Sequence, residues 1–93
     1  NHNIFFTEKQ AKSALAMAQI SQLIPYYGNE ITDEEWMDPH MDKFILERYC
    51  NEISTDIRTV YRLYSLLAFH TKEQRDEFLK YNERLVKDYL MID

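Results

Sequence analysis

A helix-start sequence that occurs twice constrains the fold of this chain more than any other feature. Phe6-Thr7-Glu8-Lys9-Gln10 near the beginning matches Phe69-His70-Thr71-Lys72-Glu73-Gln74 near the end. Thr at the start of a helix accepts a hydrogen bond from the backbone one turn in, and Gln three residues later bonds back to the Thr backbone N–H. The repeat therefore predicts helices that begin at Thr7 and Thr71, each entered from a strand that ends in aromatic residues.

The helix after Thr71 is predicted to lie on a core. Its apolar residues recur at the helical period and cover about half of the circumference, and charged residues cover the other half. Arg75 and Asn82 interrupt the apolar side. We interpret Arg75 as extending along the edge of the core and Asn82 as capping a nearby strand. A polar contact point for a partner is the alternative.

The helix after Thr7 is apolar around most of its circumference, and Pro25 ends it before the turn Tyr26–Asn29. Such a helix is usually buried on more than one side. Two explanations stay open. The sheet and the acidic loop cover the helix within one monomer, or the helix mediates self-association.

Two strands are predicted between the helices, Phe44–Tyr49 and Thr59–Tyr64, with Asn51–Asp56 as the connecting turn. A helix through residues 53–69 also fits the apolar spacing and is the alternative. The predicted order is strand, helix, loop, strand, strand, helix. It corresponds to a small α+β domain in which two helices cover one face of an antiparallel sheet.

The 93 residues are enough for one domain, 1–93, and we expect residues 1–3 to be disordered or left over from cloning. No apolar run approaches the roughly 18 residues of a membrane span, and we expect no secretory signal and no membrane partner. The single Cys50 cannot form an internal disulfide, which favours a reducing compartment. The net charge is −5, and six of the acids lie between Tyr26 and Asp42, where no Lys or Arg occurs.

Residues for catalysis or metal binding are not spaced in any recognisable pattern. His2, His40 and His70 lie in different predicted elements, and Asp38 and Asp42 beside His40 are too few for a zinc or calcium site. With one Gly in the chain there is no phosphate-binding loop. We therefore expect no metal, no cofactor and no enzymatic activity.

Several segments resemble a family of small proteins encoded by phages and prophages of gut bacteria. The resemblance lies in Phe6–Ala11 with Ala14–Leu23, in Phe69–Thr71 with Arg75–Leu79 and Leu85-Val86, and in Glu35-Trp36 and Lys43–Leu46 between them. It covers about Phe5–Leu90. Members often carry a second Trp and a Pro-Asp pair in the linker, where this chain has only Trp36 and the order Asp38-Pro39. The resemblance implies a phage or mobile-element protein of the bacterial cytoplasm or the virion, and it implies no activity.

The sequence favours a non-enzymatic interaction module that binds itself, another phage protein or a host protein. Aromatic residues are enriched in protein interfaces, and the expected contact residues are Tyr26, Tyr27, Trp36 and Met37. The same residues could instead form a lid on the core. The alternative function is binding of single-stranded nucleic acid by a sheet face that carries Arg48, Arg58, Arg62 and Tyr64.

Overall fold

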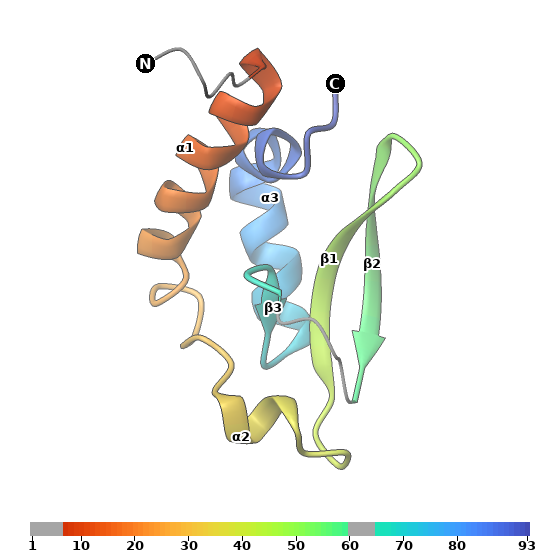
Figure 1. The fold of residues 1–93 in the computed structure, drawn as a ribbon. Coiled ribbons are helices and arrows are strands. Elements are labelled where there is room, and N and C mark those ends of the chain that lie inside the picture. Colours follow the sequence, from red (N-terminus) through yellow and green to blue (C-terminus); the bar gives the residue numbers. More distant parts are fainter. Residues whose placement is uncertain (1–6, 60–64) are drawn as a thin grey trace.

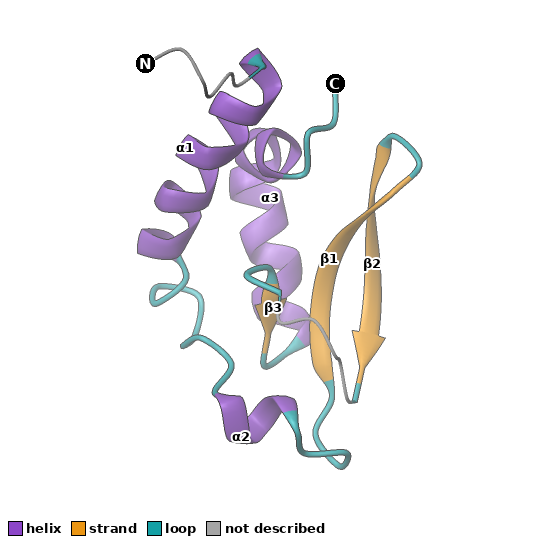
Figure 2. Ribbon diagram, viewed as in Figure 1, coloured by secondary structure: helices purple, strands orange, loops and turns teal. Residues whose placement is uncertain are grey.

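Three helices and three strands make up the part of the chain that the computed structural model describes, residues 7–59 and 65–93. In chain order they are α1 Glu8–Leu23, α2 Asp33–Trp36, β1 Lys43–Tyr49, β2 Glu52–Arg58, β3 Ala68–Phe69 and α3 Lys72–Tyr89 (Figures 1 and 2). The predicted α+β class is confirmed. The strand expected before Thr7 and the expectation for residues 1–3 fall outside the described residues.

Both predicted helix starts are confirmed as capping boxes. Gln10 N donates to Thr7 Oγ1 at 3.1 Å and Thr7 N donates to Gln10 Oε1 at 2.9 Å. The same reciprocal pair joins Thr71 and Gln74 at 3.1 and 3.3 Å. The short strand β3 ends at Phe69, directly before the second box, as the repeat predicts.

The sheet is antiparallel, with β1 in the centre, β2 on one side and β3 on the other. β1 and β2 pair from Lys43 with Arg58 to Tyr49 with Glu52, so that only Cys50 and Asn51 form the turn. Cys50 has a φ of 56°, and a positive φ at the first of two loop residues is typical of a type II′ hairpin.

The predicted turn over Asn51–Asp56 is wrong, because a strand occupies most of it. Residues 52–58 form β2, where a turn over 51–56 and, alternatively, a helix through 53–69 were predicted. Ile53, Thr55 and Ile57 alternate with polar residues, and this period of two decides the structure more than the turn-forming residues among them. Residues 60–64 of the predicted strand lie outside the described residues.

Two hydrophobic clusters lie on opposite faces of the sheet. The main cluster joins α1, β1, β3 and α3 through Ile20, Ile24, Leu46, Leu67, Phe69, Phe78 and Val86. The smaller cluster joins the segment around α2 to the other face through Ile31, Trp36, Ile45 and Ala68. Neighbouring strand residues separate in this way because successive side chains point to opposite faces.

The two long helices lie on the same side of the sheet, as predicted. α3 contacts β1 and β3, and α1 packs against α3 (Figure 1). The side chain of Leu46 enters the main cluster from β1, so this is the face that the helices cover. The acidic segment, here residues 30–42, covers part of the opposite face with Ile31 and Trp36.

The end of α3 is closed by a Schellman motif that the sequence did not reveal. Met91 N donates to Asp88 O at 3.2 Å and Ile92 N donates to Lys87 O at 2.8 Å. Met91 takes the left-handed conformation, with a φ of 57°, at the position where Gly is usual. This turn buries Ile92, which is 4% exposed.

Asn82 and Arg75 hold α3 to its neighbours in ways that differ from their predicted roles. Asn82 caps no strand. Its Nδ2 donates to Tyr27 Oη at 3.3 Å and to Phe78 O at 3.1 Å, and its backbone leaves the helical range, which kinks α3. Arg75 is only 6% exposed, with its guanidinium carbon 5.7 Å from the centre of the Phe44 ring.

A second cation, Lys43, is completely buried at the start of β1. Its Nζ donates to Asp38 O at 2.7 Å, to Met41 O at 2.8 Å and to Thr59 O. The ammonium group therefore ties the end of the acidic segment to the residue that follows β2. The backbone carbonyl oxygens take the place of the water molecules that the ammonium group loses on burial.

Candidate interaction surface

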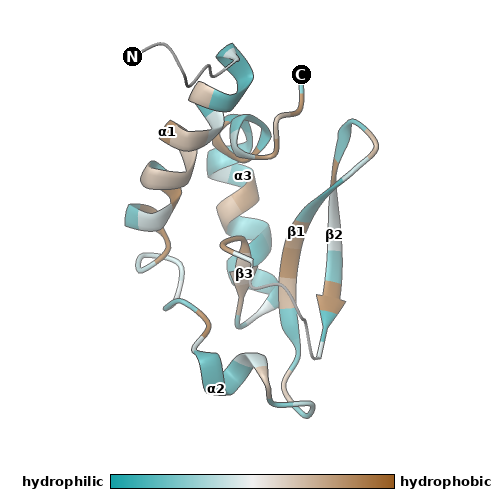
Figure 3. Ribbon diagram, in the orientation of Figure 1, coloured by the Kyte–Doolittle hydropathy of each residue, from teal (hydrophilic) through white to brown (hydrophobic). Residues whose placement is uncertain are grey.

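The helix α1 has a buried side and an exposed side that are both apolar. Ala16, Ile20 and Ile24 are at most 4% exposed, and the two isoleucines belong to the main cluster. The opposite side carries the exposed residues Ala11, Ala14, Leu15, Ala18 and Gln22, and we call it the outer face of α1. Figure 3 shows hydrophobic colour along the middle of this helix. Packing within the monomer therefore accounts for the apolar residues on the buried side of α1, but not for those on its outer face.

Two large exposed side chains of α1 point to different sides: Leu15 belongs to the outer face, whereas Met17, two residues later, does not. Leu15 is 62% exposed and Met17 is 50% exposed. Between Ala11 and Leu23 the single charged residue is Lys12, which lies on the flank of the helix beside Arg84 of α3. Along more than three turns, the outer face therefore presents alanine and leucine side chains and the amide of Gln22 to solvent, without a charge.

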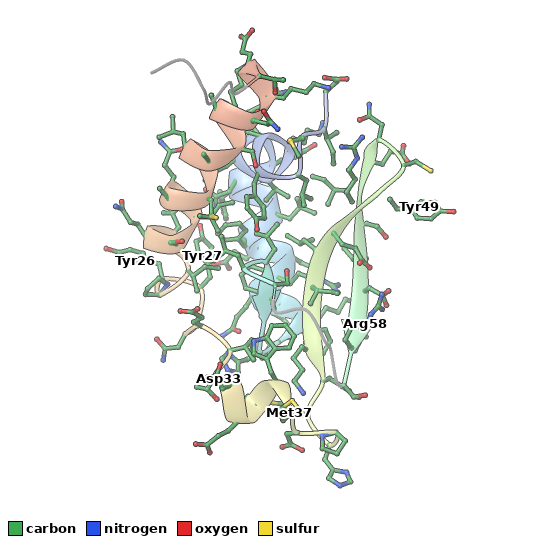
Figure 4. All side chains as sticks on the ribbon, in the orientation of Figure 1. Tyr26, Tyr27, Asp33, Met37, Tyr49 and Arg58 are labelled. Atoms are coloured by element: carbon green, nitrogen blue, oxygen red, sulfur yellow. The ribbon has the colours of Figure 1, made fainter. Side chains whose placement is uncertain are left out.

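The turn that follows α1 places two neighbouring tyrosines differently. Tyr26 is 82% exposed, and Figure 4 shows it pointing away from the molecule beside the end of α1. Tyr27 points inward, and its ring meets Phe78 edge to face with 5.1 Å between the ring centres. The hydroxyl of Tyr27 accepts the hydrogen bond from Asn82. Tyr26 can contact a partner, whereas Tyr27 connects the turn to α3.

The other two predicted contact residues, Trp36 and Met37, also differ in exposure. Trp36 is 2% exposed and belongs to the smaller cluster, so it forms part of the lid that the sequence offered as the alternative. Met37 is 64% exposed, but Figure 4 shows it far from Tyr26. The four residues do not form one patch. Among them, Tyr26 alone is both exposed and next to the end of α1.

A third capping box holds the acidic segment in place. Thr32 N donates to Glu35 Oε1 at 2.9 Å, and Glu35 N donates to Thr32 Oγ1 at 3.1 Å. Both carboxylate oxygens of Glu35 also lie 3.1 Å from His70 Nε2. The Thr32 N–H and then His70 lower the pKa of Glu35 below its usual value. The signal Thr-x-x-Glu was present in the sequence and is the one that could have located α2.

The arginines proposed for nucleic-acid binding are already engaged within the molecule. Arg48 donates to Cys50 O at 2.7 Å, to Met91 O at 3.1 Å and to Leu90 O at 3.3 Å, joining the hairpin turn to the end of α3. Cationic side chains at a helix C-terminus are favoured by the helix dipole.

Arg58 is paired directly with Lys43 of β1, so these two side chains lie on the same face of the sheet. Arg48 is five residues after Lys43 on β1 and therefore lies on the opposite face, because successive side chains of a strand alternate. It pairs with Glu47 at 3.4 Å and with Asp56, whose pKa it lowers together with the N–H of Ile57. Figure 4 shows Arg58 beside β2. Arg62 and Tyr64 lie outside the described residues. The predicted Arg/Tyr face is therefore wrong for the two arginines that the structure describes.

Within residues 7–59 and 65–93, no three His, Cys, Asp or Glu side chains are grouped so that they could hold a metal ion. No helix of this described part is long and apolar enough to span a membrane. His40, Asp38 and Asp42 surround an exposed turn, in which His40 N donates to Asp38 Oδ1 at 2.8 Å. Comparison of the chain with family models, curated proteins and solved structures gives no match.

Proposed function

We propose that the protein is a non-enzymatic interaction module that self-associates through the outer face of α1. The observation that carries this proposal is the exposure of Leu15, at 62%, on the outer face of α1, which carries no charged residue. When a second surface covers exposed apolar side chains, their removal from water stabilises the complex. The resemblance to phage and prophage proteins suggests a role in the bacterial cytoplasm or the virion, with the protein itself or a phage or host protein as partner.

A second copy is the occupant that the charge distribution favours. The acidic segment carries six acids and no base, whereas the rest of the chain carries ten acids and eleven bases. The outer face of α1 itself is uncharged, so two copies can meet through it without bringing a charge into the contact, while the acidic segments stay outside it. In a dimer with two-fold symmetry, each contact also occurs twice, because both subunits contribute the same patch.

Light scattering coupled to size-exclusion chromatography tests self-association over a range of concentrations. We expect a dimer whose fraction rises with concentration, and Leu15→Glu should shift it to monomer because the carboxylate cannot be covered without loss of hydration. Tyr81→Glu is the matched control, since Tyr81 is 66% exposed on α3, away from the outer face. A monomer at every concentration, or equal effects of the two variants, would contradict the proposal.

The same chromatogram addresses the alternative of nucleic-acid binding. A protein-like 260/280 nm absorbance ratio is expected. A raised ratio that falls steeply as salt increases would support binding of nucleic acid, because counterion release makes such binding salt-dependent. An Arg62→Ala variant that leaves the nucleic-acid affinity unchanged would remove that alternative.

A further inference from the structure

The acidic segment and the start of α1 lie at opposite ends of the molecule. α1 runs from the end that carries the C-terminal residue Asp93 toward the end that carries α2 (Figure 1). Lys9 Nζ pairs with Asp93 Oδ1 at 2.7 Å near the start of the helix. The six acids therefore follow the end of α1, and the bases that balance the chain lie elsewhere.

The two ends of α1 also differ in charge. Its first turn carries Glu8, which suits the positive end of the helix dipole, but its last turn has no basic residue to suit the negative end. Lys12 lies on the flank of the helix in the first half. A basic side chain from a partner would therefore stabilise the last turn.

We propose that two copies pair with their α1 helices antiparallel, about a two-fold axis that crosses between Leu15 and Ala18. This inference rests on the proposed function. In this arrangement Lys12 approaches the last turn of the partner's α1, and the two acidic segments lie at opposite ends of the dimer. A parallel pairing would place the acidic segments side by side, and like charges within about 10 Å repel at 0.1 M salt.

The outer face of α1 has the spacing that such an axis requires. Ala11 and Gln22 lie at equal distances from the axis, and so do Leu15 and Ala18. Three alanines on this face let the backbones approach closely, since the distance between packed helices depends on the side chains at the contact. The 16 residues of α1 span about 24 Å, which leaves Tyr26 beside the partner's first turn.

Cysteine cross-linking distinguishes the two orientations. The native Cys50 is exposed, so all variants are made with Cys50→Ser. In the antiparallel pair, Ala11→Cys mixed with Gln22→Cys should give a mixed disulfide, because a disulfide needs Cα atoms within about 7 Å. Ala11→Cys alone should give none, since its two copies would lie about 16 Å apart along the helix. Ala18→Cys alone should cross-link near the axis.

Each outcome is read by intact mass under non-reducing conditions, with light scattering on the reduced samples. The mixed disulfide without an Ala11→Cys homodimer supports the inference. Cross-linked homodimers of Ala11→Cys and of Gln22→Cys would overturn it in favour of a parallel pair, and self-association would stand. A dimer without any cross-link would place the interface away from this face and overturn both the inference and the proposed contact. A monomer would overturn the proposed function itself.

Discussion

Replacing Lys43 by Met removes a buried charge while keeping the length of the side chain. Lys43 is 0% exposed, and its ammonium group donates to three backbone carbonyls. Met fills the same space without a donor. The change therefore leaves the carbonyl oxygens of Asp38, Met41 and Thr59, in a partly buried region, without this partner.

The expected loss follows from two opposing terms. Each hydrogen bond to a charged group contributes about 1.5–3 kcal/mol to stability, so three contribute several kcal/mol. The variant no longer has to dehydrate an ammonium ion, which returns part of that loss. We expect a net decrease of about 3–5 kcal/mol in the free energy of unfolding, similar to breaking a buried ion pair. A domain of this size has about 5–14 kcal/mol in total.

Thermal unfolding followed by circular dichroism measures this decrease. At about 4–8 °C per kcal/mol, Tm should fall by about 12–40 °C. Lys72→Met is the control, because Lys72 is exposed in the first turn of α3 and its loss should change stability by no more than about 0.5 kcal/mol. Equal melting temperatures for the two variants would refute the view that carbonyl contacts stabilise the buried charge.

Three further variants test separate contacts. Met91→Gly should raise the free energy of unfolding by about 0.5–1 kcal/mol in urea titrations, because Gly relieves the positive φ at the end of α3; a loss would refute the strain argument. Tyr27→Phe should lower it by about 0.5–1.5 kcal/mol, since the ring contact stays while the hydrogen bond from Asn82 is lost; the effect should vanish in an Asn82→Ala background. Glu35→Gln keeps the cap on Thr32 but loses the charge that faces His70. Since folding lowers the pKa of Glu35, its carboxylate stabilises the protein above the unfolded pKa of about 4.3, and this contribution disappears as pH falls through the folded pKa. Unfolding curves of the two proteins should therefore differ at pH 6 and converge in acid; a constant difference would contradict this.

The helix starts could be predicted because their cause is local. Thr7 and Gln10 are three residues apart, and the bonds between them need no other part of the chain. The same local signal at Thr32 and Glu35 is masked by the acidic residues around it, which indicate a loop. α2 has only four residues and gives no helical period that would have drawn attention to it.

The hairpin turn and the buried cations could not be predicted from the local sequence. The turn at Cys50 and Asn51 has no Gly, so the sequence lacks the usual signal for a two-residue loop. Lys43 is indistinguishable in sequence from a surface lysine, since its carbonyl partners meet only after the acidic segment folds back and β2 pairs. The exposure of Leu15 and Met17 likewise depends on which side of α1 faces α3.

The single tryptophan of the chain lies in the smaller of the two clusters. Its fluorescence therefore reports on the attachment of the acidic segment, whereas far-UV circular dichroism reports mainly on α1 and α3. If the segment detaches before the main cluster opens, the two signals will change at different temperatures, and a two-state analysis of either one alone would give a misleading stability. Coincident transitions would show that the sheet couples its two faces into one cooperative unit.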